Sequence, residues 1–229
     1  GEVNTRLGLN GIPALAEELI VARDLYLAEY SDIKVHFSHI TTAGSVDLIR
    51  KAKAKGLKVS ASVPAHHLLI TDDSAETFDS NFKTNPPFRD QAHIDALISG
   101  LKDGTIDAII SDHEPHEIEA KYSEFSRAES GVLGLETAFS VAYEVLKNHI
   151  GLGEIIAKFT EGPRAVLNVD HPTIEEGETA ELTIFSPSID WQYNEEEIKS
   201  RSKNSPVIGR KLQGLPVAVI NNGKLFLNA

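Results

Sequence analysis

The first 170 residues alternate between short apolar segments of strand character and longer segments with helical spacing, and this alternation most constrains the fold. Strands are expected over residues 34–39, 58–63 and 106–111. The last of these is almost continuously apolar, which is typical of a strand buried on both faces of a parallel sheet. Because parallel strands need crossover helices, and the intervening segments can supply them, the pattern predicts an α/β fold built from βα units.

Apolar residues recur at helical spacing in the segments between and after these strands. Pro13 stands near the start of the first segment, where its fixed φ suits a helix N-terminus. The turn sequence Asp103-Gly104 follows the third segment. The expected helices cover residues 12–29, 45–55, 90–101, 134–149 and 153–160.

The character of the sequence changes after about residue 170. A polar turn at residues 175–178 precedes a strand-like segment at 180–185. A hairpin is expected from residues 216–220 and 224–227, because the tight-turn sequence Asn221-Asn222-Gly223 joins them. The sequence therefore predicts an α/β part at residues 1–170 and a small β-domain at residues 171–229.

About four βα units are visible before residue 170, whereas a (β/α)8 TIM barrel has eight and typically about 250 residues. Half a barrel leaves two long strand edges unpaired, which promotes aggregation. The alternative is an open, doubly wound sheet of four strands, which is complete without a second half. The absence of methionine and the abrupt start inside a helix-like segment favour roughly the C-terminal half of a barrel, and so a fragment.

Composition excludes several classes of partner and site. The net charge of −12 argues against nucleic acid or an anionic membrane as the main partner. Because the 229 residues include no cysteine, a metal would be held by His, Asp or Glu and never by thiolate. No apolar run approaches the roughly 20 residues that span a bilayer, so we expect a cytoplasmic protein.

His39 and Asp112 stand out because each closes a predicted strand. In a parallel α/β barrel the carboxyl ends of the strands form the rim of the active site. A histidine and an aspartate at two such ends suit a divalent metal such as zinc, and the aspartate can also act as a general base toward water. The structural alternative is a hydrogen-bonded histidine and a helix-capping aspartate, since two ligands alone do not make a catalytic zinc site.

Two loops present further polar groups. Residues 111–116 place two histidines and two acids directly after a strand, and Pro115 stiffens this loop so that His116 is fixed relative to Asp112. The rigid loop Asn85-Pro86-Pro87 presents an amide that can both donate and accept hydrogen bonds. His66-His67 precedes an apolar run, which favours a structural role. The histidines expected to be surface or packing residues are His36, His93, His149 and His171.

Taken together and in this order, several motifs resemble dihydroorotases of the bacterial type, in the amidohydrolase superfamily. Each motif alone is weak, but the combination is specific. The matching stretches are Gly11-Ile12-Pro13, Ala16-Glu17, Arg23-Asp24, His39-Ile40-Thr41-Thr42-Ala43-Gly44-Ser45, residues 64–69, Asn85-Pro86-Pro87-Phe88-Arg89, residues 103–107, residues 112–116, Gly134-Leu135-Glu136-Thr137-Ala138, Asn204-Ser205-Pro206 and Gly209.

The resemblance implies a (β/α)8 barrel with a small β-sandwich built from both chain ends. It implies reversible, zinc-dependent hydrolysis of dihydroorotate to N-carbamoyl-L-aspartate in pyrimidine synthesis. By position, His39 resembles a zinc ligand, and Asp112 resembles the ligand that is also the general base and acid. Asn85 and His116 resemble substrate-binding residues, while Ser130 and Gly131 fall where the family contacts substrate through its backbone.

This chain departs from the family pattern in several places. The family's His-x-His strand, a bridging acid or carboxylated lysine, a further histidine ligand and a substrate-binding arginine have no counterpart here. Glu114 stands where a small alanine is usual, and Ala65 stands where proline is usual. Glu129-Ser130 replaces the usual pair before Gly131. Glu114 adds negative charge near a site for a carboxylate, which disfavours substrate binding.

Three other functions stay open at this point. One is another cyclic amidase, such as a hydantoinase, although the motifs around Asn85 and Asp112 favour dihydroorotase. A second is a non-catalytic dihydroorotase-like subunit that scaffolds another pyrimidine enzyme, but such a scaffold needs neither His39 nor Asp112. The third is an ordinary α/β domain without metal. For the enzyme we expect one or two zinc ions, a small-molecule substrate and a homodimer.

Overall fold

The computed structural model describes residues 2–228. Its first sheet has three parallel strands in the order β1 (Val35–Phe37), β2 (Val59–Pro64) and β3 (Ala108–Ile110). Val35 pairs with Val59, and Ser62 pairs with Ala108. The three predicted strands are therefore present; β1 and β3 are shorter than expected, and β2 has the expected length but lies one residue later.

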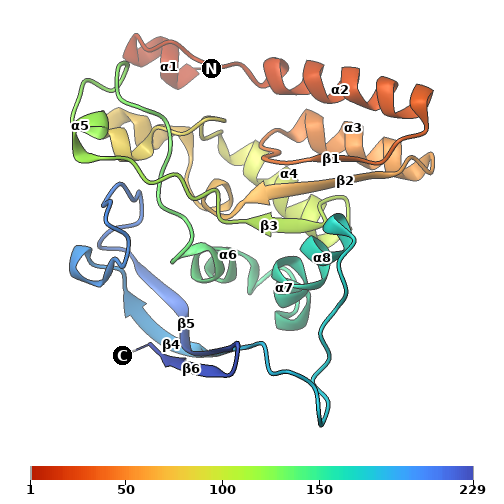
Figure 1. Cartoon of the computed structure of the whole chain (residues 1–229). Coiled ribbons are helices and arrows are strands. Elements are labelled where there is room, and N and C mark those ends of the chain that lie inside the picture. The colour runs from red at the N-terminus through yellow and green to blue at the C-terminus, as the bar shows by residue number, and fades with distance from the viewer. Residues whose placement is uncertain (1, 229) are drawn as a thin grey trace.

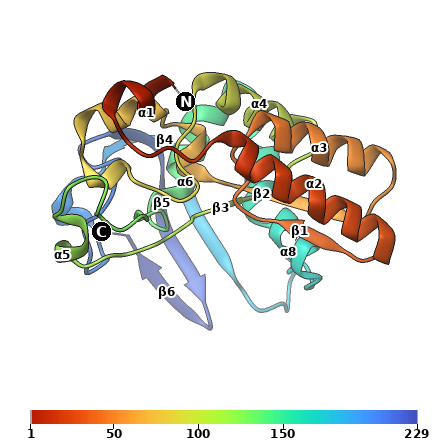
Figure 2. The ribbon, with the colours of Figure 1, turned by 90° about the horizontal axis from the view of Figure 1, so that it is seen from above.

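Helices cover both sides of the parallel sheet. In Figure 1, α2 (Ala14–Ser31) and α3 (Ala43–Ala54) lie above it, with α4 (Gln91–Lys102) behind. Figure 2, seen from above, shows α2 and α3 side by side. Below the strands in Figure 1 lie α6 (Ala138–Leu146), α7 (Leu152–Phe159) and α8 (Glu161–Leu167).

Local capping sets where the predicted helices begin. Pro13 is the N-cap of α2, with extended backbone, so the helix starts after it. The side chain of Thr42 accepts a hydrogen bond from the Ser45 amide, and the side chain of Asp90 accepts one from the His93 amide, so these residues cap α3 and α4. Three parallel strands lie within residues 2–228, fewer than the four βα units expected, because no strand precedes α2 there.

The second sheet is antiparallel and contains β4 (Leu182–Gln192), β5 (Lys211–Asn221) and β6 (Lys224–Leu227). The predicted hairpin is confirmed: Asn222 and Gly223 both have positive φ, 48° and 70°, between β5 and β6. One antiparallel sheet is present in residues 2–228. The division into two domains at residue 170 stays a prediction.

Short elements that the sequence did not reveal connect the others. They are α1 (Glu2–Leu7), α5 (Ile118–Lys121) and the 3-10 helices η1 (Ala65–Leu68), η2 (Asp72–Thr77), η3 (Ser80–Phe82) and η4 (Glu195–Glu197), together with α8. No helix in the described part of the chain is long and apolar enough to cross a bilayer.

One hydrophobic core runs through both sheets. Val46 and Ile49 of α3 and Ala61 and Val63 of β2 are completely buried in it. The same cluster includes Val141 and Leu146 of α6 and, from the C-terminal region, Tyr193 and Leu212. Helix α6 therefore packs against the parallel layer on one side and against β5 on the other.

Candidate metal and substrate site

His39 and Asp112 meet at the carboxyl edge of the parallel sheet. Nε2 of His39 lies 2.8 Å from Oδ1 of Asp112, although 73 residues separate them in sequence. Both residues follow strand ends and have left-handed backbone, with φ of 58° and 47°. Residues other than glycine rarely adopt this conformation, and it costs roughly 1–3 kcal/mol unless the surroundings impose it. The structure therefore brings these two side chains together, and their role as metal ligands stays a prediction.

The loop after His39 is held by a carboxylate from α2. Oε1 of Glu17 accepts hydrogen bonds from the backbone amides of Thr41 and Thr42, at 3.0 and 3.1 Å. The hydroxyl of Thr41 also donates to Glu17. On its other side, the Nδ1 atom of His39 contacts the Ser38 hydroxyl. These contacts explain how an otherwise unfavourable backbone conformation at His39 is maintained.

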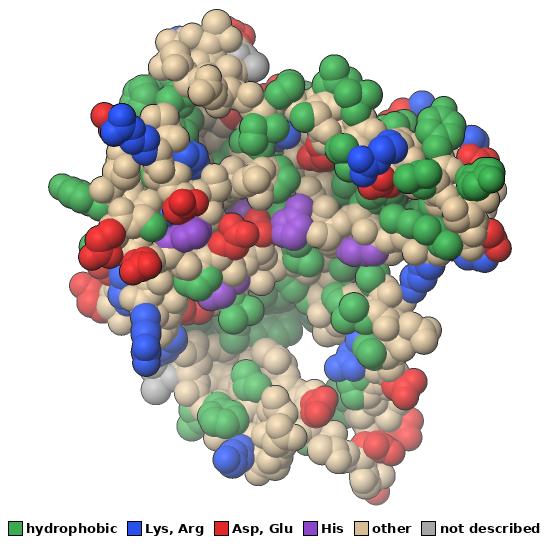
Figure 3. Space-filling model, turned by 45° about the horizontal axis from the view of Figure 1, so that its top comes forward, with side chains coloured by type: hydrophobic (Ala, Val, Ile, Leu, Met, Phe, Trp, Pro, Cys, Tyr) green, Lys and Arg blue, Asp and Glu red, His purple; other side chains and the backbone are tan. Residues whose placement is uncertain are grey.

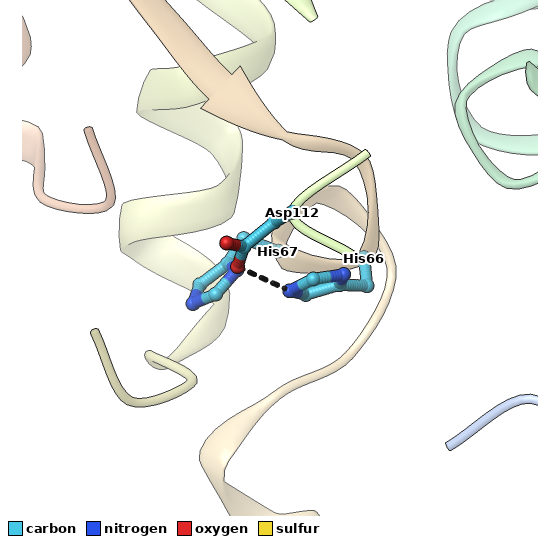
Figure 4. A group of neighbouring side chains, drawn as sticks. All are labelled: His66, His67 and Asp112. Carbon is cyan, nitrogen blue, oxygen red and sulfur yellow. Dashed lines mark ion pairs between the residues drawn. The ribbon is translucent and has the colours of Figure 1, made fainter. Parts of the chain in front are cut away.

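The double histidine lies beside Asp112, where it was expected only to pack. His66 and His67 follow β2 in η1 and are 4% and 1% exposed. Nε2 of His66 lies 3.2 Å from Oδ2 of Asp112 (Figure 4). Because His39 contacts the other oxygen, Oδ1, the carboxylate has a histidine at each oxygen. The signal that reveals them is the one used for His39 and Asp112: they follow the carboxyl end of a parallel strand.

The donor set of this cluster suits a metal ion. His66, His67 and Asp112 each offer one ligand atom within 4.8 Å of the others. Nδ1 of His66 and Nδ1 of His67 are buried without a hydrogen-bond partner in residues 2–228, which is rare for buried polar atoms. Imidazole nitrogens and carboxylate oxygens are ligands that zinc accepts. The residues present therefore fit a divalent cation.

Electrostatics keep the carboxylate charged and one imidazole neutral. Burial acts to raise the pKa of Asp112, but the neighbouring His39 and His66 outweigh it and hold that pKa well below its usual range. The hydrogen bond with Asp112 raises the pKa of His39. Burial lowers the pKa of His67 well below its usual value, and the adjacent His66 adds to this. Neutral imidazole is the form that binds metal.

The predicted substrate-binding residues His116, Ser130 and Gly131 form a second group. Nε2 of His116 lies 2.8 Å from the carbonyl oxygen of Ser130. Gly131 has φ of 131°, and a Cβ there would lie 2.5 Å from Oε2 of Glu114 and 2.7 Å from Nε2 of His116. Only glycine allows the loop to approach this closely. The two predicted substrate loops are thus in direct contact.

The loop of Asn85 is adjacent to both groups, while Asn85 itself is exposed. The carbonyl of Pro86 is 3.0 Å from Nε2 of His67. Two residues before Asn85, the carbonyl of Lys83 accepts the Gly131 amide hydrogen bond at 2.9 Å. Across one face of the molecule, histidine and acidic side chains alternate in a row (Figure 3).

A cavity of about 320 Å³ opens next to these loops, between residues 9–14 and 82–90. Ser130 and Arg89 line it, whereas His39, Asp112, Asn85 and His116 do not. The guanidinium of Arg89 is buried and donates to the carbonyl of Ile12 at 2.6 Å. Of the predicted site residues, the structure therefore places only Ser130 in this cavity.

Comparison with known proteins identifies the family. The sequence profile of the Amidohydrolase family matches residues 11–226, which is nearly the whole chain. The chain belongs to the amidohydrolase family. Members of this family are generally metal-dependent hydrolases, which agrees with the donor set around Asp112.

Similar proteins refine this placement within the amidohydrolases. A dihydroorotase from Ruminiclostridium cellulolyticum is 45% identical over 97% of this chain and 53% of its own length. A dihydroorotase from Endomicrobium trichonymphae is 42% identical over 98% of this chain and 54% of its own length. The resemblance noted in the sequence is confirmed. The chain spans about half the length of these relatives.

A solved structure shows the same fold. The L-hydantoinase (dihydropyrimidinase) from Arthrobacter aurescens superposes with a TM-score of 0.87 at 27% identity, over 94% of this chain and 49% of that one. Structural neighbours of this kind are TIM-barrel enzymes, so the barrel prediction is confirmed. The open doubly wound sheet considered as an alternative is not the fold of this chain.

Proposed function

We propose that this amidohydrolase chain provides part of the active site of a zinc-dependent dihydroorotase. The reaction is the reversible hydrolysis of dihydroorotate to N-carbamoyl-L-aspartate, in pyrimidine biosynthesis. The observation that carries the proposal is the pairing of His39 with Asp112 at 2.8 Å, both in left-handed backbone at the carboxyl ends of strands. We choose dihydroorotate as the substrate because similar proteins, one of them 45% identical, are named dihydroorotase.

His39 and Asp112 would hold the zinc through Nε2 and a carboxylate oxygen. A catalytic zinc site has at least three protein ligands, so further ligands come from His66 or from other parts of the protein, and one or two ions are expected. Zinc at this position would polarise the ring carbonyl and lower the pKa of a bound water toward about 7.

Asp112 would carry the proton during hydrolysis. Its pKa lies well below the usual range, so it is ionised but a weak base on its own. The proton that it accepts would come from a water whose own pKa is lowered. The water oxygen bonds to the ring carbonyl carbon, the bond from that carbon to the ring nitrogen breaks, and Asp112 returns the proton to the departing nitrogen. One proton of the water thus reaches the departing nitrogen through Asp112, and the other stays on the new carboxyl group until solvent removes it.

His116, Asn85 and the backbone of Ser130 and Gly131 would bind the substrate. His116 suits the substrate carboxylate, and the exposed amide of Asn85 suits the ring amide. The partner is thus a small molecule, and we expect a cytoplasmic homodimer. Glu114 lies against Gly131, so its charge opposes binding of an anionic substrate.

The test is hydrolysis of dihydroorotate by the zinc-loaded protein in its full native length. Wild-type protein is expected to turn over dihydroorotate, and Asp112→Asn is expected to lower kcat by at least about a thousandfold, since it removes the group that moves the proton. Dihydrouracil and hydantoin serve as competing substrates. Turnover of these alone would favour a hydantoinase, and no turnover with zinc bound would favour a non-catalytic subunit.

A further inference from the structure

Asn204 joins the two loops that carry the predicted substrate-binding residues. It lies between η4 and β5, in the C-terminal region of the chain, and is 4% exposed. Its Nδ2 group donates to the carbonyl of Glu114 at 2.9 Å and to the carbonyl of Gly131 at 3.1 Å. Its Oδ1 atom accepts the backbone amide of His116 at 3.2 Å.

The side chain of Asn204 therefore uses both of its donors and one acceptor position on the two loops. Its own backbone carbonyl accepts the amide of Leu133 at 2.8 Å, which adds a fourth contact. A buried amide with these partners has one orientation, because a flip would turn its oxygen toward two carbonyl oxygens and its NH2 group toward the His116 amide.

The partners of Asn204 are the residues around the predicted substrate contacts. His116 reaches the carbonyl of Ser130, and Gly131 has no room for a side chain beside Glu114 and His116. The backbone also joins these loops, through the parallel bridge of His113 with Val132, in which the Glu114 amide donates to the carbonyl of Val132 at 2.8 Å. Asn204 is thus one of several links that hold His116 near the Ser130–Gly131 backbone, and it is the link that the C-terminal region supplies.

The segment that carries Asn204 is itself fixed to the barrel layer. The carboxylate of Glu136, just before α6, accepts the amides of Lys199 and Ser200, each at 2.9 Å. Nζ of Lys203 donates to the carbonyls of Glu195 and Ile198. The residues directly before Asn204 are therefore held in place.

We propose that Asn204 is a positioning residue, through which the C-terminal β region sets the geometry of the substrate-binding loops. This inference rests on the proposed function for its effect on substrate. Asn204 touches neither the metal cluster nor any reacting atom, so it acts on binding through His116 and Gly131. Removing it is expected to loosen the loops while the groups around Asp112 stay in place.

Two variants and a neighbouring control test the role of Asn204. Asn204→Ala removes the amide, and Asn204→Asp keeps its shape while replacing the two donors with an acceptor that faces two carbonyls. Ser205→Ala is the control, because Ser205 is equally buried but its hydroxyl bonds only within its own segment, to the Val207 amide. Thermal unfolding shows that each variant is folded, and the isosteric Asp variant carries the test if the Ala variant is not.

Two readouts on the zinc-loaded protein separate the inference from the proposed function. Hydrogen exchange at the His116 amide is expected to accelerate about tenfold or more in both variants. Asn204→Ala removes the acceptor of this amide. In Asn204→Asp, repulsion between the carboxylate and the carbonyls of Glu114 and Gly131 displaces the acceptor oxygen. KM for dihydroorotate is expected to rise about tenfold, with kcat within about threefold of wild type, and Ser205→Ala is expected to change neither. Unchanged exchange, or faster exchange at unchanged KM, overturns the inference. If wild-type protein does not hydrolyse dihydroorotate, the proposed function fails, and exchange alone decides whether Asn204 joins the loops.

Discussion

At the scale of single residues, the candidate site combines backbone strain with buried, unpartnered donors. His39 and Asp112 both hold left-handed backbone, and Nδ1 of His66 and Nδ1 of His67 have no hydrogen-bond partner in the described chain. Strain and unsatisfied polar groups each cost free energy, so they concentrate where a function needs them. A bound cation would satisfy the imidazole nitrogens and neutralise part of the charge on Asp112.

Zinc affinity distinguishes ligands from the residues that orient them. His39→Ala and Asp112→Asn are expected to weaken zinc binding by more than about 100-fold, whereas loss of an orienting partner costs about 10–100-fold. His66→Gln falls in the lower range if His66 only orients Asp112. Competition with a chromophoric chelator measures these affinities. His149→Gln, an exposed histidine away from the cluster, is the control, and an equal loss there would refute the assignment.

A buried lysine makes stability depend on pH. Lys121 is 7% exposed and donates to the carbonyls of Glu129 and Gly131 at 2.8 and 3.0 Å. Burial lowers its pKa to about 8, and nearby Lys83 adds to this. Its unfolded pKa is about 10.4, so between these values the unfolded chain binds more protons than the native one.

The free energy of unfolding should therefore rise as pH increases from about 8 to 10.4, because the cost of the buried charge is full below pH 8 and is relieved above it. The rise from Lys121 is at most about 3 kcal/mol. Urea unfolding across this range measures it. Lys121→Met is expected to remove this rise, and a profile identical to that of wild type would show that Lys121 does not cause it.

At the scale of elements, glycines mark where segments approach each other closely. A Cβ at Gly134 would lie 1.8 Å from the carbonyl oxygen of Ser111, in the strand-to-loop segment before Asp112. A Cβ at Gly153, near the start of α7, meets no atom within 4 Å. The same substitution is thus expected to have opposite effects at these two positions.

Gly134→Ala is expected to lower the free energy of unfolding by about 3 kcal/mol or more, since two backbone segments would have to separate. Gly153→Ala is expected to raise it by about 0.5–1 kcal/mol, because alanine loses less conformational entropy in a helix. Chemical denaturation of the two variants beside wild type measures both changes. A stable Gly134→Ala protein would mean that this loop moves freely.

The sequence predicted the strands and most helices because their periodicity is local. It did not predict that α6 begins at Ala138 and not at 134, nor that Gly134 lies against Ser111, because periodicity carries no information on such contacts. The position of both residues at strand ends predicted that His39 and Asp112 meet. Their positive φ could not be predicted, because neither residue is glycine, the residue that usually marks this conformation. His66 also follows a strand end, but the apolar run after His67 favoured a structural role. Asn204 was missed because it lies in the C-terminal region, away from the strand ends, and its contacts reach up to 90 residues along the chain.

At the scale of the whole molecule, one core joins the parallel and antiparallel sheets. Tyr193 and Leu212 belong to the same buried cluster as Ile49 and Leu101. Asn204 adds polar contacts from the C-terminal region to the loops after β3. Two units sharing a core of this kind unfold together, whatever boundary the sequence suggests near residue 170.

Trp191 makes this cooperativity measurable, since it is the only tryptophan of the sequence and lies in β4. Its fluorescence follows the antiparallel sheet, while far-ultraviolet circular dichroism follows the helices, and the two denaturation midpoints are expected to coincide. Leu212→Ala in β5 and Leu101→Ala in α4, each 2% exposed, should each lower stability by about 2–5 kcal/mol and shift both signals equally. If Leu212→Ala moved only the fluorescence and Leu101→Ala only the dichroism, the two regions would be independent domains, and Asn204 would connect the substrate loops to a separately folding unit.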